Sequence, residues 1–144
     1  MKRSTFPTPQ DAEAAFYEAL ERADLEAMME VWAEDEEIVC VHPAGPRLSG
    51  YEQVRESWSQ IFGSRQRLRV HLSNQVYVQA MMLSIHSLHE NILVGDETKP
   101  RAPMVTTNVF VRTGNGWRML VHHASPAPAS APTAGGGETP KILH

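Results

Sequence analysis

Four polar residues lie in stretches of the sequence that are rich in apolar residues, and the histidine and glutamate side chains among them could do acid–base chemistry. Asn108 and His122 belong to the segment from Val105 to Ser125, and His86 and Glu90 come shortly before it. Histidine is the natural general acid or base near neutral pH, and a carboxylate within hydrogen-bond reach would orient it. A dyad of His86 or His122 with Glu90 is therefore one hypothesis, although the spacing alone does not require these side chains to meet.

The segment from Val105 to Ser125 indicates a β-hairpin. Its Asn115-Gly116 pair supplies the two positive φ angles of a type I′ turn between two apolar runs. Both faces of both arms carry apolar residues, so we expect one face to be covered by helices and the other by a second subunit or a bent sheet. Asn108, His122 and His123 are the polar exceptions, and such residues are the informative ones.

Alternate residues of a strand share one face, which groups the candidates further. An inward Asn108 implies that Thr106 and Phe110 also point inward. The preceding strand carries both of the other candidates, His86 and Glu90, on one face. The members of that face are Ser84, His86, Leu88 and Glu90. Together these faces could line an apolar pocket with a few convergent polar groups. The alternative is that each polar residue is satisfied within a core or at an interface.

Cys40 and His42 lie two residues apart in a short predicted strand and so share a face. A nucleophilic Cys–His pair is one interpretation. A buried free cysteine that acts as a small apolar residue is several times more common. His42 precedes Pro43, where we expect the strand to meet a turn near the mouth of the pocket.

The histidines do not predict a metal site. His122 and His123 are adjacent on a strand and point to opposite faces, and His86 and His89 differ by an odd step, so neither pair can chelate an ion within a straight strand. We expect neither a metal nor another cofactor.

The composition of the 144 residues is that of one globular domain, with 42% hydrophobic and 21% charged residues. A formal net charge of −4 gives no electrostatic reason to expect nucleic acid or an anionic membrane as a partner. The single cysteine excludes an internal disulfide, and no stretch is long and apolar enough for a spanning helix. The amino terminus lacks the apolar run of a signal peptide, so we expect a cytoplasmic protein.

Three amphipathic helices are predicted in the first half of the chain. Thr8 and Asp24 are the expected N-caps of the first and second helices. Ser49 with Glu52 predicts a capping box for the third helix, which should end at Gly63.

The strands follow the helices along the chain. A short strand is expected at 38–42, and long strands at 68–78 and 81–94 join the hairpin to make four long antiparallel strands. Helices and antiparallel strands that are segregated in this way indicate an α+β fold. We expect an N-terminal arm at residues 1–8, a domain at 9–126 and a flexible Pro/Ala/Gly-rich tail at 127–144.

Several fragments resemble the nuclear-transport-factor-2-like superfamily, in particular its SnoaL-like and ketosteroid-isomerase-like domains. They are Ala15 to Leu20, Val41 to Pro43, Gly50 to Val54 and Gly116 to Ser125. The association domain of calcium/calmodulin-dependent kinase II is also similar. The resemblance implies a cystatin-like cone, in which a strongly bent antiparallel sheet wraps around three N-terminal helices. It further implies a pocket at the mouth of the cone, a homodimer through the outer sheet face, and pocket-side positions for Leu120, His122 and Ala124.

The resemblance determines the fold better than the function, because the superfamily contains isomerases, dehydratases, cyclases, binding proteins and oligomerisation modules. The Asp base and the Tyr–Asp oxyanion pair of ketosteroid isomerases cannot be assigned here. Positions that carry pocket arginines in the kinase association domain correspond to Asn108, Ala124 and, by a looser alignment, His86. Their loss favours neutral ligands over anions.

Two hypotheses result. In the first, a SnoaL-like pocket protein binds a small neutral hydrophobic metabolite and isomerises, dehydrates or cyclises it by His-based acid–base chemistry. His122, His86 and Glu90 are its catalytic candidates, and its ligand-binding candidates are Trp32, His42, Trp58, Phe62, Asn108, Phe110 and His122. In the second, the chain is a non-enzymatic dimerisation or association module with a vestigial pocket.

Overall fold

The computed structural model describes residues 4–34, 37–99 and 101–128, and it has an α+β fold. Three helices come first, interrupted by two short strands, and four long strands follow. In chain order the elements are α1 (Pro9–Arg22), α2 (Leu25–Val31), β1 (Val39–Val41), β2 (Arg47–Ser49), α3 (Tyr51–Gly63), β3 (Leu68–Gln79), β4 (Leu83–Val94), β5 (Met104–Thr113) and β6 (Gly116–Pro126). Within the described part of the chain, no helix is long and apolar enough to cross a membrane.

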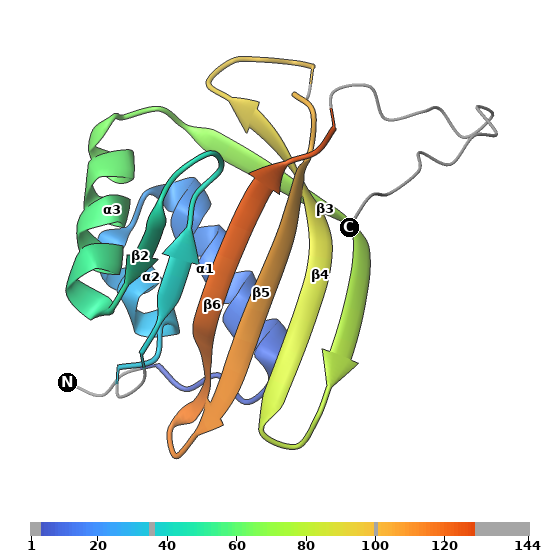
Figure 1. Ribbon diagram of the computed structural model, residues 1–144. Helices are drawn as coiled ribbons and strands as arrows, with labels where there is room; N and C mark the ends of the chain where they lie inside the picture. The colour runs from blue at the N-terminus through green and yellow to red at the C-terminus, as the bar shows by residue number, and fades with distance from the viewer. Residues whose placement is uncertain (1–3, 35–36, 100, 129–144) are drawn as a thin grey trace, which may run out of the picture.

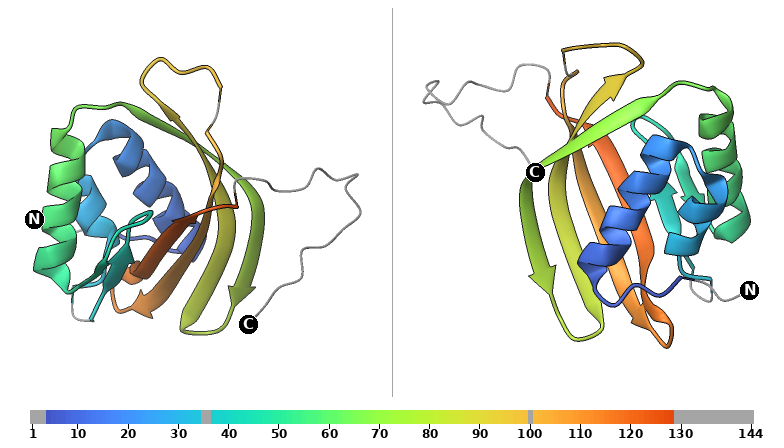
Figure 2. Two further views of the ribbon diagram at one scale, coloured as in Figure 1. Left: turned by 45° about the horizontal axis from the view of Figure 1, so that its top comes forward. Right: turned by 180° about the vertical axis from the view of Figure 1, so that it is seen from behind.

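The strands form one curved sheet with the order β2-β1-β6-β5-β4-β3. The sheet bends around α1, and the helices lie on its concave face (Figures 1 and 2). The four long strands are antiparallel, as predicted, but β1 pairs with β6 in parallel, so the sheet is mixed. The sequence could not indicate this pairing, because no tight turn joins β1 to β6 and so fixes their relative direction.

Two of the three predicted helix caps are confirmed. The Thr8 hydroxyl accepts a hydrogen bond from the Asp11 backbone N–H at 3.0 Å, and the Asp24 carboxylate accepts one from the Ala27 N–H at 3.1 Å. The predicted capping box of α3 is wrong. Gly50 is the N-cap there, because Ser49 belongs to β2, where it pairs with Val39.

The core lies between the helices and the concave face of the sheet. Phe16 is completely buried at its centre, with its ring centroid 5.6 Å from that of Trp58 and 6.4 Å from that of Trp32. These edge-on contacts between large rings contribute beyond the apolar area that they bury. The inward faces predicted for β4 and β5 are also confirmed, because Ser84, His86, Leu88, Glu90, Thr106, Asn108 and Phe110 are all buried.

Two bulges interrupt the ladders between the long strands. On β3, Asn74 and Gln75 together oppose a single residue of β4, and Asn74 has a positive φ of 51°. On β6, Leu120 is an extra residue between the partners of Val109 and Phe110. This second bulge changes the parity of β6, so that Met119 and His122 are both buried while Leu120 is half-buried.

The β5–β6 turn differs from the type I′ turn that we predicted. Among the described residues, Gly116 has a positive φ of 96° and Asn115 does not. Gly114 and Asn115 connect the paired residues Thr113 and Gly116, and the Thr113 hydroxyl accepts from the Asn115 N–H at 3.1 Å while it donates to Gly116 O at 2.7 Å. The Thr113 side chain therefore stabilises a turn in which the residue with positive φ is Gly116 and not Asn115.

The predicted N-terminal arm is packed against this turn from Ser4 onward. The Trp117 N–H donates to Phe6 O at 2.8 Å, and the buried Arg118 guanidinium donates to Ser4 O at 2.6 Å and to Glu30 O at 2.7 Å. At the other end of the domain, the Ala127 N–H donates to Pro103 O at 3.0 Å. The flexible tail therefore stays a prediction that concerns mainly residues 129–144, which lie outside the described residues.

Replacing Gly116 by alanine should destabilise the protein. A Cβ at this position would stand 2.7 Å from Phe6 O and would have to adopt a φ that only glycine accepts readily. We expect Gly116→Ala to lower the free energy of unfolding by about 1–3 kcal/mol, measured by urea denaturation. Gly114→Ala is the matched control, because nothing lies within 4 Å of its added Cβ, and it should change stability by less than about 0.5 kcal/mol. Equal effects of the two substitutions would contradict this account of the turn.

Candidate functional site

A cavity of about 250 Å³ lies between α1, α3 and the end of the sheet where β4 finishes and β5 begins. Its wall is mainly apolar, and its polar members are His42, Glu90, Arg101 and His122. The apolar members include Leu20, Trp58, Ile61, Leu68, Ile92, Val94 and Met104. An apolar cavity with a few polar groups is the usual form of a small-molecule site.

His122 is the polar residue of β6 that reaches this cavity. Its ring centroid lies 4.8 Å from that of Phe16 and 6.1 Å from that of Trp58. Asn108 is its direct partner across the β5–β6 ladder, and Nδ1 of His122 lies 2.7 Å from Oδ1 of Asn108. One ring nitrogen of His122 is thus held by the fold, and Nε2 makes no hydrogen bond to any described residue.

Asn108 connects His122 to two buried carboxyl groups. Its Nδ2 donates to Oε2 of Glu13 and to the Tyr17 hydroxyl, each at 3.0 Å. The Tyr17 hydroxyl in turn donates to Oε2 of Glu90 at 2.5 Å. Tyr17 and Asn108 therefore lie between His122 and Glu90, which the sequence hypothesis placed in direct contact.

His86 has a different carboxyl partner and a different environment. Its Nδ1 lies 3.0 Å from Oε2 of Glu13, and its Nε2 lies 2.9 Å from the Ser84 hydroxyl. The ring is completely buried between Tyr77 and Phe110, with centroid distances of 4.2 and 5.0 Å. His86 thus belongs to the same polar network as His122 but does not line the cavity.

The other predicted ligand-binding residues divide between the cavity wall and the core. His42 and Trp58 line the cavity, with the His42 ring edge-on to Trp58 at 4.7 Å. Trp32 and Phe110 are completely buried and belong to the core. Phe62 packs on Trp58 with a centroid distance of 5.7 Å and is not part of the wall.

Cys40 and His42 lie close together, with 3.7 Å between Sγ and Nε2, but the cysteine is not activated. Burial, together with the nearby Glu90, raises the pKa of the Cys40 thiol to about 12. Burial also lowers the pKa of His42, whose Nε2 lies 3.0 Å from the Ser57 hydroxyl. The thiol therefore stays protonated near neutral pH, which favours the interpretation of Cys40 as a core residue.

Sequence reasoning missed Glu13 and Tyr17, which are the members of the network contributed by α1. Both are buried, and they are four residues apart, so they lie on one face of the helix. A glutamate on the face that also carries Phe16 and Leu20 was a signal, because an unpaired charge is rarely buried.

Burial shifts the pKa values of His122 and Glu90 in opposite directions. It lowers the pKa of His122 to about 3, with further effects from His42 and His123. Burial raises the pKa of Glu90, against the hydrogen bond from Tyr17, which lowers it. Each group is thus held nearer to its neutral form, in which the imidazole accepts a proton and the carboxylic acid donates one.

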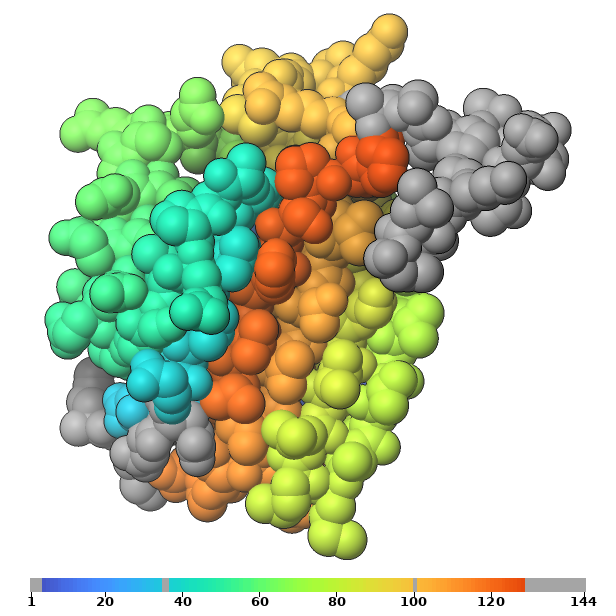
Figure 3. Space-filling model, viewed as in Figure 1, coloured from blue at the N-terminus to red at the C-terminus, as the bar shows by residue number. Residues whose placement is uncertain are grey.

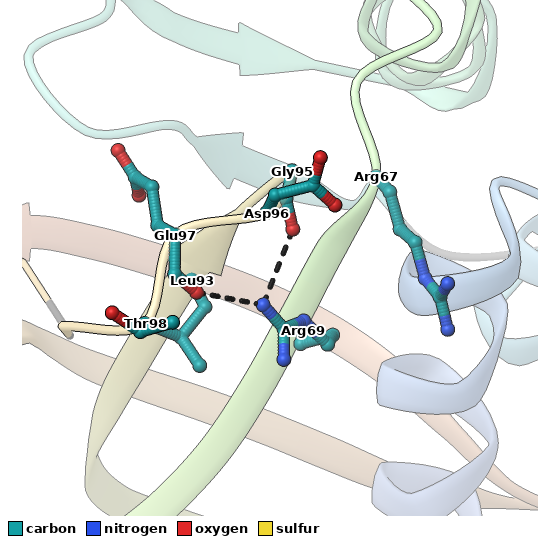
Figure 4. A pocket seen from close by; sticks show the side chains of 7 residues that line it. All are labelled: Arg67, Arg69, Leu93, Gly95, Asp96, Glu97 and Thr98. Carbon is teal, nitrogen blue, oxygen red and sulfur yellow. Dashed lines mark hydrogen bonds between the residues drawn. The ribbon is translucent and has the colours of Figure 1, made fainter.

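A second hollow, of about 480 Å³, lies at the surface beside the β4–β5 loop and is lined by Arg67, Arg69, Leu93, Gly95, Asp96, Glu97 and Thr98 (Figure 4). The Arg69 guanidinium donates to the backbone carbonyls of Gly95 and Glu97 at 3.2 and 2.8 Å (Figure 4). Because this arginine already holds the loop and the buried polar network lies elsewhere, the smaller cavity is the better functional candidate.

The curved sheet with helices on its concave face and a cavity at its end defines the nuclear-transport-factor-2-like, or cystatin-like, class of α+β domains. Within this class, residues 10–130 match the model of the SnoaL-like domain family, and the chain belongs to that family. The resemblance inferred from the sequence is thus confirmed.

Two solved structures and one plant protein illustrate the relationship. A candidate calcium/calmodulin-dependent protein kinase type II association domain from Thiobacillus denitrificans is 40% identical, with a TM-score of 0.82 over 87% of this chain and 99% of that one. A candidate dehydratase of the nuclear-transport-factor-2-like family from Streptomyces avermitilis is 34% identical, with a TM-score of 0.75 over 82% of this chain and 92% of that one. The F-box protein SKIP8 of Arabidopsis thaliana is 28% identical over 112 residues, which are 76% of this chain, and the matched region spans 46% of SKIP8.

The lowered pKa of His122 predicts a specific dependence of stability on pH. Between pH 6.5 and about 3 the unfolded chain binds a proton at this residue and the folded protein does not. The contribution of His122 to stability is therefore fully present above pH 6.5 and declines by up to about 1.4 kcal/mol per pH unit as the pH falls. In urea denaturation from pH 7 to 4, His122→Leu should flatten this decline, whereas His123→Gln, at an exposed position, should keep it. If the free energy of unfolding fell with pH in parallel for His122→Leu and the wild type, the lowered pKa of His122 would be contradicted.

Proposed function

We propose that the protein binds a small neutral hydrophobic molecule in the cavity and that His122 and Glu90 act on it in an isomerisation, dehydration or cyclisation. One observation carries the proposal. The ring of His122 is held at Nδ1 by Asn108 and borders an apolar cavity whose wall also includes Glu90. A base and an acid that share one apolar cavity can move a proton between two positions of a bound ligand.

The roles follow from the protonation states that the cavity favours. His122 is neutral near pH 7, so its free Nε2 can accept a proton from the ligand. Glu90 keeps its proton to a higher pH than an ordinary glutamic acid, so it can donate one. The Glu13 carboxylate, which is linked to His122 through Asn108, would stabilise the imidazolium that forms.

The charges around the cavity support a neutral ligand. The uncharged residues Asn108 and Ala124 stand where the kinase association domain is expected to carry arginines. Arg101, at the cavity, donates to both carboxylate oxygens of Glu97 at 3.2 and 3.0 Å. Its charge is therefore already partnered, and an anionic ligand would meet no free cation among the described residues of the wall.

Changing His122 to leucine should abolish the chemistry and leave the fold intact. Leucine keeps an apolar volume in the wall, and the lost hydrogen bond to Asn108 should cost about 1–3 kcal/mol of stability. We would screen neutral cyclic alcohols and ketones by thermal shift and assay each one that binds for isomerisation or loss of water. We expect the wild type to convert a bound compound and His122→Leu to lose conversion. His123→Gln, on the opposite face of β6, should retain it. Equal conversion by His122→Leu would remove the histidine from the mechanism.

A second candidate function, a non-enzymatic association module, is favoured by the outer face of the sheet. On this face the strands β3 to β5 expose apolar side chains, namely Val76, Val78, Leu83, Ile85 and Val105. In Figure 3 the described helices leave this face of the long strands uncovered. A second copy of the chain would cover an apolar surface of this kind, and a homodimer is compatible with either function. The cytoplasmic location also stays a prediction.

An arginine on the outer face should prevent association. Ile85 lies near the centre of β4, where a dimer would bury a charged side chain without a partner. We expect wild-type protein at micromolar concentration to sediment as a dimer and Ile85→Arg as a folded monomer. Gln60→Arg, on the exposed side of α3, is the control and should remain dimeric. A monomeric wild type would exclude this interface.

A further inference from the structure

We propose that Glu13 and Asn108 hold His122 in the tautomer with hydrogen on Nδ1, and that the cavity is therefore selective for ligands that present a hydroxyl or N–H donor to Nε2. This inference deepens the proposed function, on which its statement about the ligand rests. The statement about the tautomer stands by itself.

The first step is the orientation of the Asn108 amide. The groups on its Nδ2 side are Oε2 of Glu13 and the Tyr17 hydroxyl, each at 3.0 Å. The carboxylate of Glu13 can only accept a hydrogen bond, and Tyr17 gives its one hydrogen to Glu90. Both neighbours therefore require a donor, and Asn108 must turn its NH₂ group toward them.

The second step is the position of the hydrogen on His122. With Nδ2 fixed, the amide oxygen of Asn108 faces Nδ1 of His122 at 2.7 Å. An amide oxygen can only accept, so Nδ1 carries the hydrogen, and in a neutral ring Nε2 then has a free lone pair. The lowered pKa of His122 agrees with a neutral ring.

The network is constrained well enough to enforce this choice. Glu13 is 3% exposed, and the His86 ring and the Tyr77 hydroxyl approach it at 3.0 and 3.5 Å. Asn108 is completely buried, so turning its amide over would place its oxygen against two acceptors, Glu13 and the Tyr17 hydroxyl, without water to compensate. A single arrangement of hydrogens is therefore strongly favoured.

The Nε2 atom of His122 is the ring nitrogen that remains available to a ligand. Nε2 accepts and does not donate, so a ligand hydroxyl or N–H is stabilised there, whereas a carbonyl or ether oxygen meets a lone pair. Buried sites discriminate strongly on this basis, because a mismatch leaves polar groups unpaired.

The tautomer can be measured without any ligand by long-range ¹H–¹⁵N NMR of the histidine side chains at pH 7. In the wild type we expect Nδ1 of His122 to have the shift of a protonated nitrogen and Nε2 that of an unprotonated one. In Glu13→Gln the new amide can donate toward position 108, so the form with hydrogen on Nε2 should become detectable. Glu18→Gln, on the exposed side of the same helix, should match the wild type.

Two results would overturn the assignment. A wild-type spectrum with the hydrogen on Nε2 contradicts the tautomer. An unchanged spectrum in folded Glu13→Gln contradicts the role of Glu13. If Glu13→Gln does not fold, Asn108→Leu serves as the second variant. It removes the amide oxygen, so the preference of His122 for hydrogen on Nδ1 should be lost.

Ligand selectivity is tested with p-cresol and p-fluorotoluene, which have nearly the same shape and differ in the hydroxyl donor. The ratio of their dissociation constants is measured for the wild type and for His122→Leu. We expect the wild type to favour p-cresol about 3- to 10-fold more than His122→Leu does, which is the usual value of one net hydrogen bond. Equal ratios would overturn the ligand class. Binding of neither probe to the wild type would contradict the pocket function on which it rests, while the NMR result would still decide the tautomer.

Discussion

The structure depends on one buried amide. Asn108 lies at the centre of the sheet's concave face, and it is the residue through which β6, α1 and the carboxyl groups of the network are joined. Each of these buried polar groups would destabilise the fold by about 1–3 kcal/mol if it lost its partner. The position of α1 over the sheet is therefore set by hydrogen bonds as well as by the packing of Phe16, and this fixed geometry positions His122.

The sequence predicted the elements of the fold well where local chemistry decides them. The caps at Thr8 and Asp24 and the alternation along β4 and β5 are local signals, and the structure contains all of them. The bulge at Leu120 and the parallel pairing of β1 could not be predicted in this way. Each depends on how distant strands fit together, and a one-residue shift in a ladder leaves no signal in the alternation before it.

The candidate site was predicted in part for a similar reason. Asn108, His122 and Glu90 stood out because they are polar in apolar strands, and the cavity or its network contains all three. The link between them could not be predicted, because Tyr17 and Glu13 lie on a helix some ninety residues earlier in the chain. Spacing within a strand defines a face, but it does not define which helix residue comes to lie on that face. For the same reason His86 was placed on the correct face and yet lies beside Glu13, away from the cavity.

The bulge at Asn74 affects how the edge of the folded sheet meets other molecules. β3 is the last strand of the sheet, and its residues from Asn74 to Gln79 are exposed, so its free edge could recruit strands from other molecules. The bulge bends this edge and interrupts its regular row of backbone donors and acceptors. An apolar edge can thus persist at the surface with a reduced tendency to aggregate, and the irregularity of β3 acts as protection against amyloid-like strand addition.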